Sequence, residues 1–330
     1  MSPSLIAILL AGLAGYAGAE AMARYRVLVD TPNARSSHIL PTPRGGGIGL
    51  VIGALAGGAV VASPTPEMMG LAIGAAIAAL AGLADDRKAQ GPIVKFGAQF
   101  MAAFVAMGSG LVFDRVALPV FGVVELGLAG TAITLLWFVG LTNAYNFMDG
   151  LDGLAGATGT VAAIFLGLAA LMMGLDGTAK LAFVLASACF GFLIVNKPPA
   201  RVFMGDVGSQ FLGFAFAGLG VLAARDDSSG LAFWLVPLLL MHFLFDTIFT
   251  AARRAMAGEN VLAAHRTHLY QRLNQAGFAH GRVALFLAAM AAIQGNAALW
   301  LGQAPWPALL APFLLQLVYA YWVTGRSIRA

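Results

Sequence analysis

The sequence predicts an all-α, polytopic integral membrane protein in which residues 1–330 form a single transmembrane domain. Composition is the first reason: 60% of the residues are hydrophobic and 10% are charged, whereas soluble domains have about 45–50% and about 25%. The second reason is that apolar runs of roughly 20 residues, the length of a helix that crosses a bilayer, follow one another along the chain. The third is that the 41 glycines fall inside these runs, where small residues let membrane helices pack closely.

Apolar stretches give about eleven predicted spans in chain order. Several are shorter than a full bilayer-spanning helix, so their boundaries are approximate. No segment between them is long enough to fold as a soluble domain. The predicted spans are 3–23, 45–62, 68–84, 95–111, 127–147, 154–173, 179–195, 209–224, 231–250, 282–302 and 308–325.

The basic residues predict how these spans are oriented. If the N-terminus lies outside, sixteen of the 19 Lys and Arg residues fall on the cytoplasmic side, and the other three are Arg115, Lys180 and Arg225. Cytoplasmic loops carry such an excess of positive charge. We therefore expect a periplasmic N-terminus and a cytoplasmic C-terminus. No run of Lys and Arg is long enough to indicate a nucleic-acid partner.

The stretch RSSHILPTPRGGGIG, at 35–49, holds Arg35, His38 and Arg44 before three glycines that open the second span. Free N–H groups and the dipole at a helix N-terminus favour anions, so the glycines are a candidate phosphate site. The alternative is that they let helices pack closely. Arg44 is a candidate for substrate binding.

The stretch GLADDRKAQGP, at 82–92, places Asp85 and Asp86 at the end of the third span. Carboxylates are unfavourable at a helix C-terminus, whose dipole favours cations. Either the adjacent Arg87 and Lys88 neutralise the pair, or one acid serves as a base or helps to handle a phosphate.

The stretch NAYNFMDGLDG, at 143–153, ends the fifth span with Asn143, Asn146, Asp149 and Asp152. The two asparagines are three residues apart and would face the same side of a helix, and the two acids follow in a glycine-flanked turn. A polar turn leaving the membrane is one interpretation. The other is a metal ion or cationic ligand, which would offset the unfavourable position of the acids.

The stretch NKPPARVFMGDVGSQFLG, at 196–213, leads into the eighth span. Asp206, with Ser209 three residues on, is either a helix N-cap or a further acid at the same cytoplasmic edge as those above. Phe203 offers an aromatic surface on which a flat base could stack.

The stretch AGENVLAAHRTHLYQRLNQ, at 257–275, carries His265, Arg266 and His268. No Glu follows the first His and no third ligand is evident, which argues against zinc and favours recognition of a diphosphate or a sugar. Asp246, near the inner end of the ninth span, is a costly intramembrane carboxylate that we expect to face the bundle interior.

The acids at the cytoplasmic span ends share a setting beside glycine, asparagine and arginine. Mg²⁺ usually binds through one or two carboxylates together with substrate phosphates. This setting indicates a magnesium-dependent site for a phosphorylated ligand at the cytoplasmic surface.

Taken together, these stretches resemble the polyprenyl-phosphate N-acetylhexosamine-1-phosphate transferase family (glycosyltransferase family 4), and in particular its O-antigen-initiating members. The resemblance runs from DTPNARSSHILPTPRGGG through ADDRK and NAYNFMDGLDGLAG to FMGDVGS, of which the last two are highly specific in this order between membrane spans. It implies an enzyme of the bacterial inner membrane that uses Mg²⁺, with Mn²⁺ as a substitute. The sugar 1-phosphate of a UDP-N-acetyl sugar would pass to undecaprenyl phosphate, releasing UMP and starting O-antigen or related cell-envelope glycan synthesis. The oligomeric state stays open, a homodimer included.

The resemblance also implies roles for individual residues. Asp206 would bind magnesium with Asn146 as a second ligand, and Phe203 and Asn196 would hold the uracil. Asp85 and Asp86 would serve the lipid phosphate, one of them as a base. The complete set is Asp85, Asp86 and Asp149 as catalytic residues, Arg44, Asn143, Asp152, Asn196, Phe203, Arg266 and His268 as substrate-binding residues, and Asp206 and Asn146 as metal ligands.

One position departs from the family pattern. The last cytoplasmic loop often reads His-x-His-His, whereas this chain has His268 followed by Tyr270 and Gln271. That resembles the O-antigen-initiating subgroup, argues against UDP-MurNAc-pentapeptide as the donor, and leaves the sugar open among GlcNAc, FucNAc and QuiNAc. The alternative class is a secondary transporter with a cation site, which predicts acids near the bilayer midplane. Asp246 alone favours that alternative.

Overall fold

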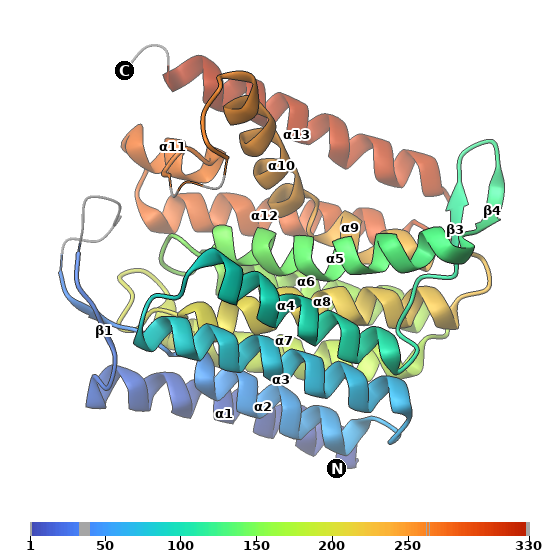
Figure 1. The fold of residues 1–330 in the computed structure, drawn as a ribbon, viewed down its shortest axis with the longest axis horizontal. Coiled ribbons are helices and arrows are strands. Elements are labelled where there is room, and N and C mark those ends of the chain that lie inside the picture. Colours follow the sequence, from blue (N-terminus) through green and yellow to red (C-terminus); the bar gives the residue numbers. More distant parts are fainter. Residues whose placement is uncertain (1, 33–39, 262, 264, 328–330) are drawn as a thin grey trace.

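Long helices that lie side by side form the body of the protein (Figure 1). The computed structural model describes residues 2–32, 40–261, 263 and 265–327, so the candidate residues Arg35 and His38 lie outside the described part of the chain. The first helix begins at one end of the bundle and the last helix ends at the other (Figure 1). An odd number of crossings would have this consequence.

The helices follow one another with short connections. Proline lies in the first turn of α1, α3 and α4, where the backbone N–H would have no partner within the helix. The side chains of Ser2 and Thr65 cap α1 and α3. The helices are α1 (Pro3–Tyr25), α2 (Gly47–Val61), α3 (Pro66–Arg87), α4 (Pro92–Gly108), α5 (Gly127–Phe147), α6 (Leu154–Met172), α7 (Asp176–Asn196), α8 (Asp206–Asp226), the 3₁₀ turn η1 (Ala232–Trp234), α9 (Leu235–Leu239), α10 (Met241–Met256), α11 (Leu269–Gln275), α12 (His280–Leu299) and α13 (Pro305–Ser327).

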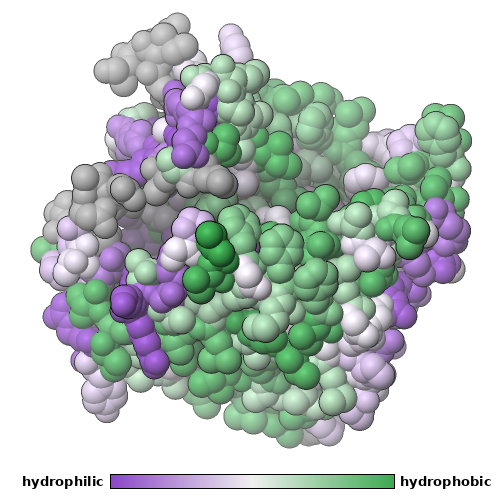
Figure 2. Space-filling model, in the orientation of Figure 1, coloured by the Kyte–Doolittle hydropathy of each residue, from purple (hydrophilic) through white to green (hydrophobic). Residues whose placement is uncertain are grey.

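The helical, membrane-spanning character of the chain is confirmed. Within the described residues, eight helices are long and apolar enough to cross a membrane, and a bent pair would make a ninth. Two shorter apolar helices, α2 and α4, coincide with the remaining predicted spans. A broad hydrophobic band runs across the middle of the molecule, and hydrophilic residues gather toward its ends (Figure 2). The count of eleven crossings and their orientation stay predictions.

Three features differ from a purely helical arrangement of straight spans. The predicted span 231–250 is broken, because η1 with α9 meets α10 at 69° and Pro237 removes one N–H from this stretch. Helix α11 forms inside the predicted loop 251–281. Two antiparallel strand pairs are also present: β1 (Val29–Asp30) with β2 (Thr42–Pro43), and β3 (Arg115–Leu118) with β4 (Gly122–Glu125).

Helix α8 is the centre of the bundle and is buried throughout its apolar length. Glycines in α2 and α3 let these two helices approach the first turn of α8 closely. A Cβ on Gly47 of α2 would come within 2.5 Å of the Gly208 Cα, and a Cβ on Gly82 of α3 would collide with the Asp206 backbone. Because these positions are glycines, α2 and α3 reach the residue that begins α8.

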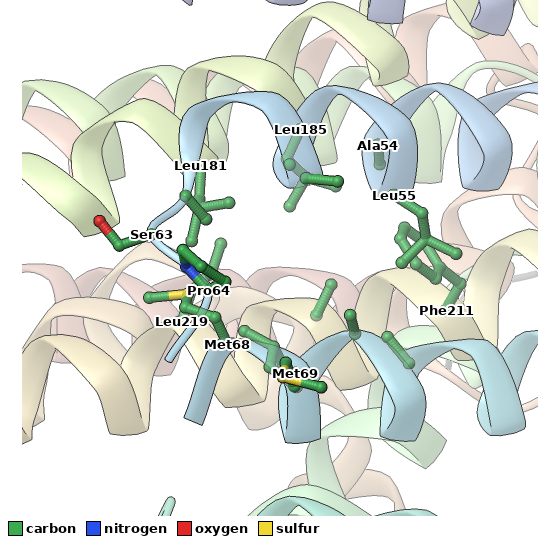
Figure 3. A pocket seen from close by; sticks show the side chains of 17 residues that line it. Ala54, Leu55, Ser63, Pro64, Met68, Met69, Leu181, Leu185, Phe211 and Leu219 are labelled. Carbon is green, nitrogen blue, oxygen red and sulfur yellow. The ribbon is translucent and has the colours of Figure 1, made fainter. Parts of the chain in front are cut away.

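The outer halves of α2 and α3, near the turn that joins them, enclose an apolar cavity of about 320 Å³ (Figure 3). Leu55, Met68 and Met69 line it from these two helices, and Leu185 of α7 and Phe211 of α8 also line it. None of the candidate functional residues lines this cavity. The candidate functional residues lie elsewhere, at the end of the bundle where the polar stretches meet.

Candidate active site

The candidate residues from separate stretches meet at one end of the bundle. The C-terminal ends of α3, α5 and α7 and the N-terminal ends of α2, α4 and α8 all lie at this end, on the left of Figure 1. Successive helices run in opposite directions, so stretches far apart in the sequence reach one surface.

A lysine lies at the centre of this site, between two of the predicted acids. The Lys95 Nζ is 2.7 Å from Asp85 Oδ2 and 3.2 Å from Asp206 Oδ2, and the two carboxylates also contact each other. Asp85 is further held by the Gln90 N–H, 2.6 Å from its Oδ1. The geometry thus brings together acids from α3 and α8 that are 121 positions apart, around a cation from the first turn of α4.

Asp86 has a different surrounding from its neighbour Asp85. Its side chain is buried, with 4% of the residue exposed, and accepts hydrogen bonds from the backbone N–H groups of Asp206 (3.0 Å) and Val207 (3.1 Å). It therefore caps α8, where a carboxylate complements the helix dipole. Gly205, with φ +78°, makes the turn before α8, and a Cβ there would come within 2.5 Å of Asp86 Oδ2.

Arg44 completes the surroundings of Asp86. Its Nε is 3.8 Å from Asp86 Oδ1 and its Nη2 donates to the Asp86 carbonyl oxygen. The backbone around it is fixed as well, because Gly46 and Gly47 donate their N–H groups to the carbonyls of Phe203 and Met204 (both 2.9 Å). These two glycine N–H groups are therefore taken, and close packing, not phosphate binding, explains them.

The two asparagines at the end of α5 engage different helices. Asn146 donates to Ser209 Oγ of α8 (2.8 Å) and its side chain also hydrogen-bonds the Asp206 carboxylate. Asn143 instead pairs with Gln99 of α4, with Nδ2 2.7 Å from Gln99 Oε1 and the reverse bond at 3.3 Å. Asn146 thus faces the acids, whereas Asn143 joins α5 to α4.

Asp149 is half-buried just beyond α5. Within the described residues its carboxylate has no hydrogen-bond or ion-pair partner. Burial, followed by the negative charges of Asp206, Asp86 and Asp152, raises the pKa of Asp149 to about 8. An acid with such a pKa can hold or release a proton near neutral pH.

Two further candidates hold the loops around the site together. Asp152 lies 3.3 Å from His280 Nδ1 and accepts from the Ala200 N–H (3.1 Å). Asn196 is buried, accepts from the Gly153 N–H (3.0 Å) and donates to the Val202 carbonyl (2.9 Å).

Phe203, by contrast, is half-exposed at the rim of the site. It is close in the chain to Asp206, and its N–H donates to the Pro43 carbonyl (2.8 Å). Stacking of a base on Phe203 stays a prediction.

The segment before α11 brings the last two candidates to the same end. His268 is buried, its Nδ1 is 3.1 Å from Asp246 Oδ1, and its ring centre is 6.1 Å from that of Phe147. Arg266 is half-buried and has no ion-pair partner among the described residues. The neighbouring His265 has a pKa lowered to about 4 by burial and by nearby positive charges, so it is neutral at pH 7.

The donor set suits a hard cation that completes its coordination from a substrate. Asp85 and Asp206 meet at the Lys95 ammonium, a position that stabilises positive charge, and the Asn146 side chain contacts the Asp206 carboxylate. Among the described residues no three His, Cys, Asp or Glu side chains could hold a metal ion alone. Magnesium commonly uses only one or two carboxylates and takes other ligands from phosphates, so the residues fit it.

Lys95 and His280 were not among the residues selected from the sequence. A single cation in the first turn of an otherwise apolar helix was the available signal for Lys95, because such a charge is costly unless it is paired. His280 lies near the end of the predicted loop 251–281, and the sequence carried no signal that pairs it with Asp152, 128 positions away.

Comparison with known proteins identifies the family of the chain. The model of glycosyl transferase family 4 matches residues 68–224. A probable undecaprenyl-phosphate N-acetylglucosaminyl 1-phosphate transferase of Bacillus subtilis is 33% identical over 293 residues, which cover 87% of this chain and 81% of that protein. The chain belongs to the polyprenyl-phosphate N-acetylhexosamine-1-phosphate transferase family.

Other relatives of this transferase show how wide the similarity is. A decaprenyl-phosphate N-acetylglucosaminephosphotransferase of Mycobacterium leprae is 33% identical over 293 residues, covering 78% of this chain and 73% of that protein. A phospho-N-acetylmuramoyl-pentapeptide-transferase of Moorella thermoacetica is 31% identical over 279 residues, covering 79% and 84%. The segment matched by the family model includes Asp85, Asn146 and Asp206.

Proposed function

We propose that the transferase moves an N-acetylhexosamine 1-phosphate from a UDP-sugar to undecaprenyl phosphate, at the cytoplasmic face of the bacterial inner membrane. UMP is released, and the lipid-linked product starts O-antigen or related cell-envelope glycan synthesis. The observation that carries the proposal is that Lys95 pairs with both Asp85 and Asp206, and Asn146 contacts Asp206, at the polar end of an apolar bundle. An apolar lipid with a phosphate head and a water-soluble nucleotide meet at such a boundary.

In the proposed reaction an oxygen of the lipid phosphate attacks the β-phosphorus of the UDP-sugar. A new P–O bond forms there, the bond from the β-phosphorus to the bridging oxygen breaks, and that oxygen leaves with UMP. Catalysis of such transfers depends on stabilising the negative charge that develops on the leaving oxygen. When bound, Mg²⁺ or its substitute Mn²⁺ supplies positive charge that stabilises this oxygen and orients the diphosphate.

Some residues would hold the metal or a substrate, and others position those residues. Asp206, Asn146 and Asp85 would hold the metal, and Asp86 fixes Asp206 by capping the helix that Asp206 begins. Arg266 is a cation without an ion-pair partner among the described residues and is available for a phosphate. Asp149 is the acid best placed by its pKa to take a proton from a lipid phosphate that arrives protonated.

The relatives indicate which donor to test first. The B. subtilis and M. leprae proteins are described as acting with N-acetylglucosamine. UDP-GlcNAc is therefore the first candidate, with UDP-FucNAc and UDP-QuiNAc beside it. The segment after His268 lacks the further histidines of the pattern His-x-His-His, which disfavours UDP-MurNAc-pentapeptide.

The one residue that favoured the transporter alternative has another explanation. It predicts acids near the bilayer midplane, and Asp246 was the candidate. Asp246 accepts hydrogen bonds from two backbone N–H groups at the start of α11, which accounts for it without a transported cation. The comparisons give no support to transport.

The test is UMP release by the purified protein in detergent, with undecaprenyl phosphate, magnesium and a panel of UDP-N-acetyl sugars. Release that needs both lipid and metal, and that is lost in Asp206→Ala, supports the proposal and names the sugar. Asp176→Ala is the matched control, because Asp176 is an exposed acid that begins α7, at the end of this helix opposite to the candidate Asn196. If folded wild-type protein releases UMP from no donor, the transferase proposal is wrong.

A further inference from the structure

Asp246 is a buried acid that neither the metal site nor the substrate site uses. It lies on α10 with 1% of its surface exposed. Its Oδ1 accepts from His268 Nδ1 (3.1 Å), from the Leu269 N–H (2.9 Å) and from Thr250 Oγ1 (3.0 Å), and its Oδ2 accepts from the Tyr270 N–H (3.2 Å). These contacts go beyond capping α11, because two of them come from the side chains of His268 and Thr250.

The arrangement repeats the one around Asp86. Asp86 caps α8 and thereby fixes Asp206; Asp246 caps α11 and thereby fixes His268, the residue just before that helix. In both cases a buried carboxylate from one helix holds the first turn of another, at the end of the bundle where the substrates would bind.

The imidazole of His268 is oriented by this contact. Because a carboxylate only accepts, the hydrogen bond to Asp246 requires the proton of a neutral His268 to be on Nδ1. The lone pair then lies on Nε2, which has no partner among the described residues. An acid behind a histidine fixes both its tautomer and its ring direction, as in other catalytic sites.

Helix α11 also contacts the loop that carries Asp149. The Tyr270 hydroxyl donates to the Phe147 carbonyl (2.9 Å), which ends α5, and it receives a hydrogen bond from Gln271 (3.1 Å). A Cβ on Gly150 would collide with that hydroxyl. The contacts run without interruption from Asp246 through α11 to the loop after α5.

We propose that Asp246 is a positioning residue of the transfer reaction: it fixes the tautomer and direction of His268 and holds α11 against the loop 148–153. The inference rests on the proposed function and adds a residue outside the predicted set. Asp246 itself touches no substrate, and its effect passes through His268 and Tyr270.

The test compares kcat/KM for UMP release in Asp246→Asn, His268→Ala and the double variant. Asp246→Asn is nearly isosteric but replaces one acceptor by a donor, and removal of such an orienting partner costs roughly 10–100-fold in activity. If Asp246 acts through His268, the double variant is no more than about threefold worse than His268→Ala alone, because residues that act as a unit are not additive. Asp176→Asn, at the opposite end, is the control and keeps wild-type kcat/KM.

Two outcomes overturn the proposal: wild-type kcat/KM in Asp246→Asn, or losses that multiply in the double variant. A purely structural acid would give the second result, because it would act on the fold independently of His268. Thermal unfolding of each variant in detergent identifies protein that has not folded.

A second measurement does not depend on enzymatic activity. Amide hydrogen exchange over residues 268–275 is expected to increase at least tenfold in Asp246→Ala, because two N–H groups lose their acceptor. Unchanged exchange contradicts the proposal even if no UDP-sugar proves to be a substrate. Absence of UMP release by the wild type, with faster exchange in Asp246→Ala, would instead contradict only the proposed function.

Discussion

Lys95 forms ion pairs with two acids of the candidate site, and its role leads to a prediction about the metal. Its ammonium pairs with both Asp85 and Asp206 and so offsets the repulsion between these neighbouring carboxylates. In Lys95→Met we expect a lower Tm in EDTA, and a larger increase in Tm on adding MgCl₂ than in the wild type, because the cation replaces the lost charge. Thermal unfolding in detergent with and without the metal measures both.

The control for this prediction is Lys88→Met, since Lys88 is an exposed cation close by in the chain. Equal magnesium stabilisation of wild type and Lys95→Met would mean that the metal does not bind between these two carboxylates.

Asp149 predicts how stability depends on pH. Its pKa rises from an ordinary 3.8 to about 8 in the folded protein, so between these values the folded chain holds a proton that the unfolded chain has released. The free energy of unfolding therefore falls as pH rises through this window and levels off above it. Without metal or substrate, we expect the Tm of the wild type to fall more than that of Asp149→Asn between about pH 6 and about pH 9.

The comparison with Asp149→Asn isolates this group, because both proteins share every other titrating side chain. Parallel Tm curves for the two proteins would show that Asp149 is ionised at neutral pH, and would remove it as a proton acceptor with a matched pKa.

At the scale of elements, the close approach of α2 to α8 leads to a prediction about packing at the site. A Cβ on Gly47 would lie 2.5 Å from the Gly208 Cα, whereas one on Gly58 of the same helix would meet only the Leu181 side chain at an ordinary 3.4 Å. Gly47→Ala should cost roughly 1–3 kcal/mol through overpacking, and it should displace Arg44, which precedes the helix. Gly58→Ala has the same gain in helix propensity without the clash.

The measurement is the Tm and the UMP-release rate of both variants. We expect both quantities to fall in Gly47→Ala, while Gly58→Ala keeps its activity and equals or exceeds the Tm of the wild type. If Gly47→Ala is as stable and active as Gly58→Ala, the two helices do not need the close contact.

Sequence patterns predicted the elements well and their contacts less well. Hydrophobic length located the long apolar helices, because the bilayer requires that length wherever a helix crosses, but it did not predict the break within 231–250. The role of Asp86 could not be read from its neighbours Arg87 and Lys88, since its partners are backbone N–H groups of α8, far along the chain. The pairing of Asn143 with Gln99 depends in the same way on which helices become neighbours. Tertiary contacts of this kind leave no local periodic signal.

At the scale of the whole molecule, charge and apolar surface are separated along the helix axes. The polar cluster lies at one end, the 320 Å³ apolar cavity lies between the outer halves of α2 and α3, and a hydrophobic band covers the middle (Figure 2). An enzyme that transfers a sugar phosphate from a water-soluble donor to a bilayer lipid needs this separation of polar and apolar surface. Its substrates come from two phases, and only the boundary between them is open to both.

This polarity makes the orientation in the membrane testable. The positive-inside rule places the end with Lys88 in the cytoplasm and the end with Asp176 outside. The single cysteine of the chain, Cys189, is buried, so a membrane-impermeant maleimide should label cysteines introduced at exposed positions and leave the wild type unlabelled. In intact spheroplasts we expect labelling of Asp176→Cys but not of Lys88→Cys, and in inverted vesicles the reverse. Labelling of Lys88→Cys from outside would place the carboxylate cluster on the periplasmic face, where no UDP-sugar is made, and would exclude the proposed reaction at that surface.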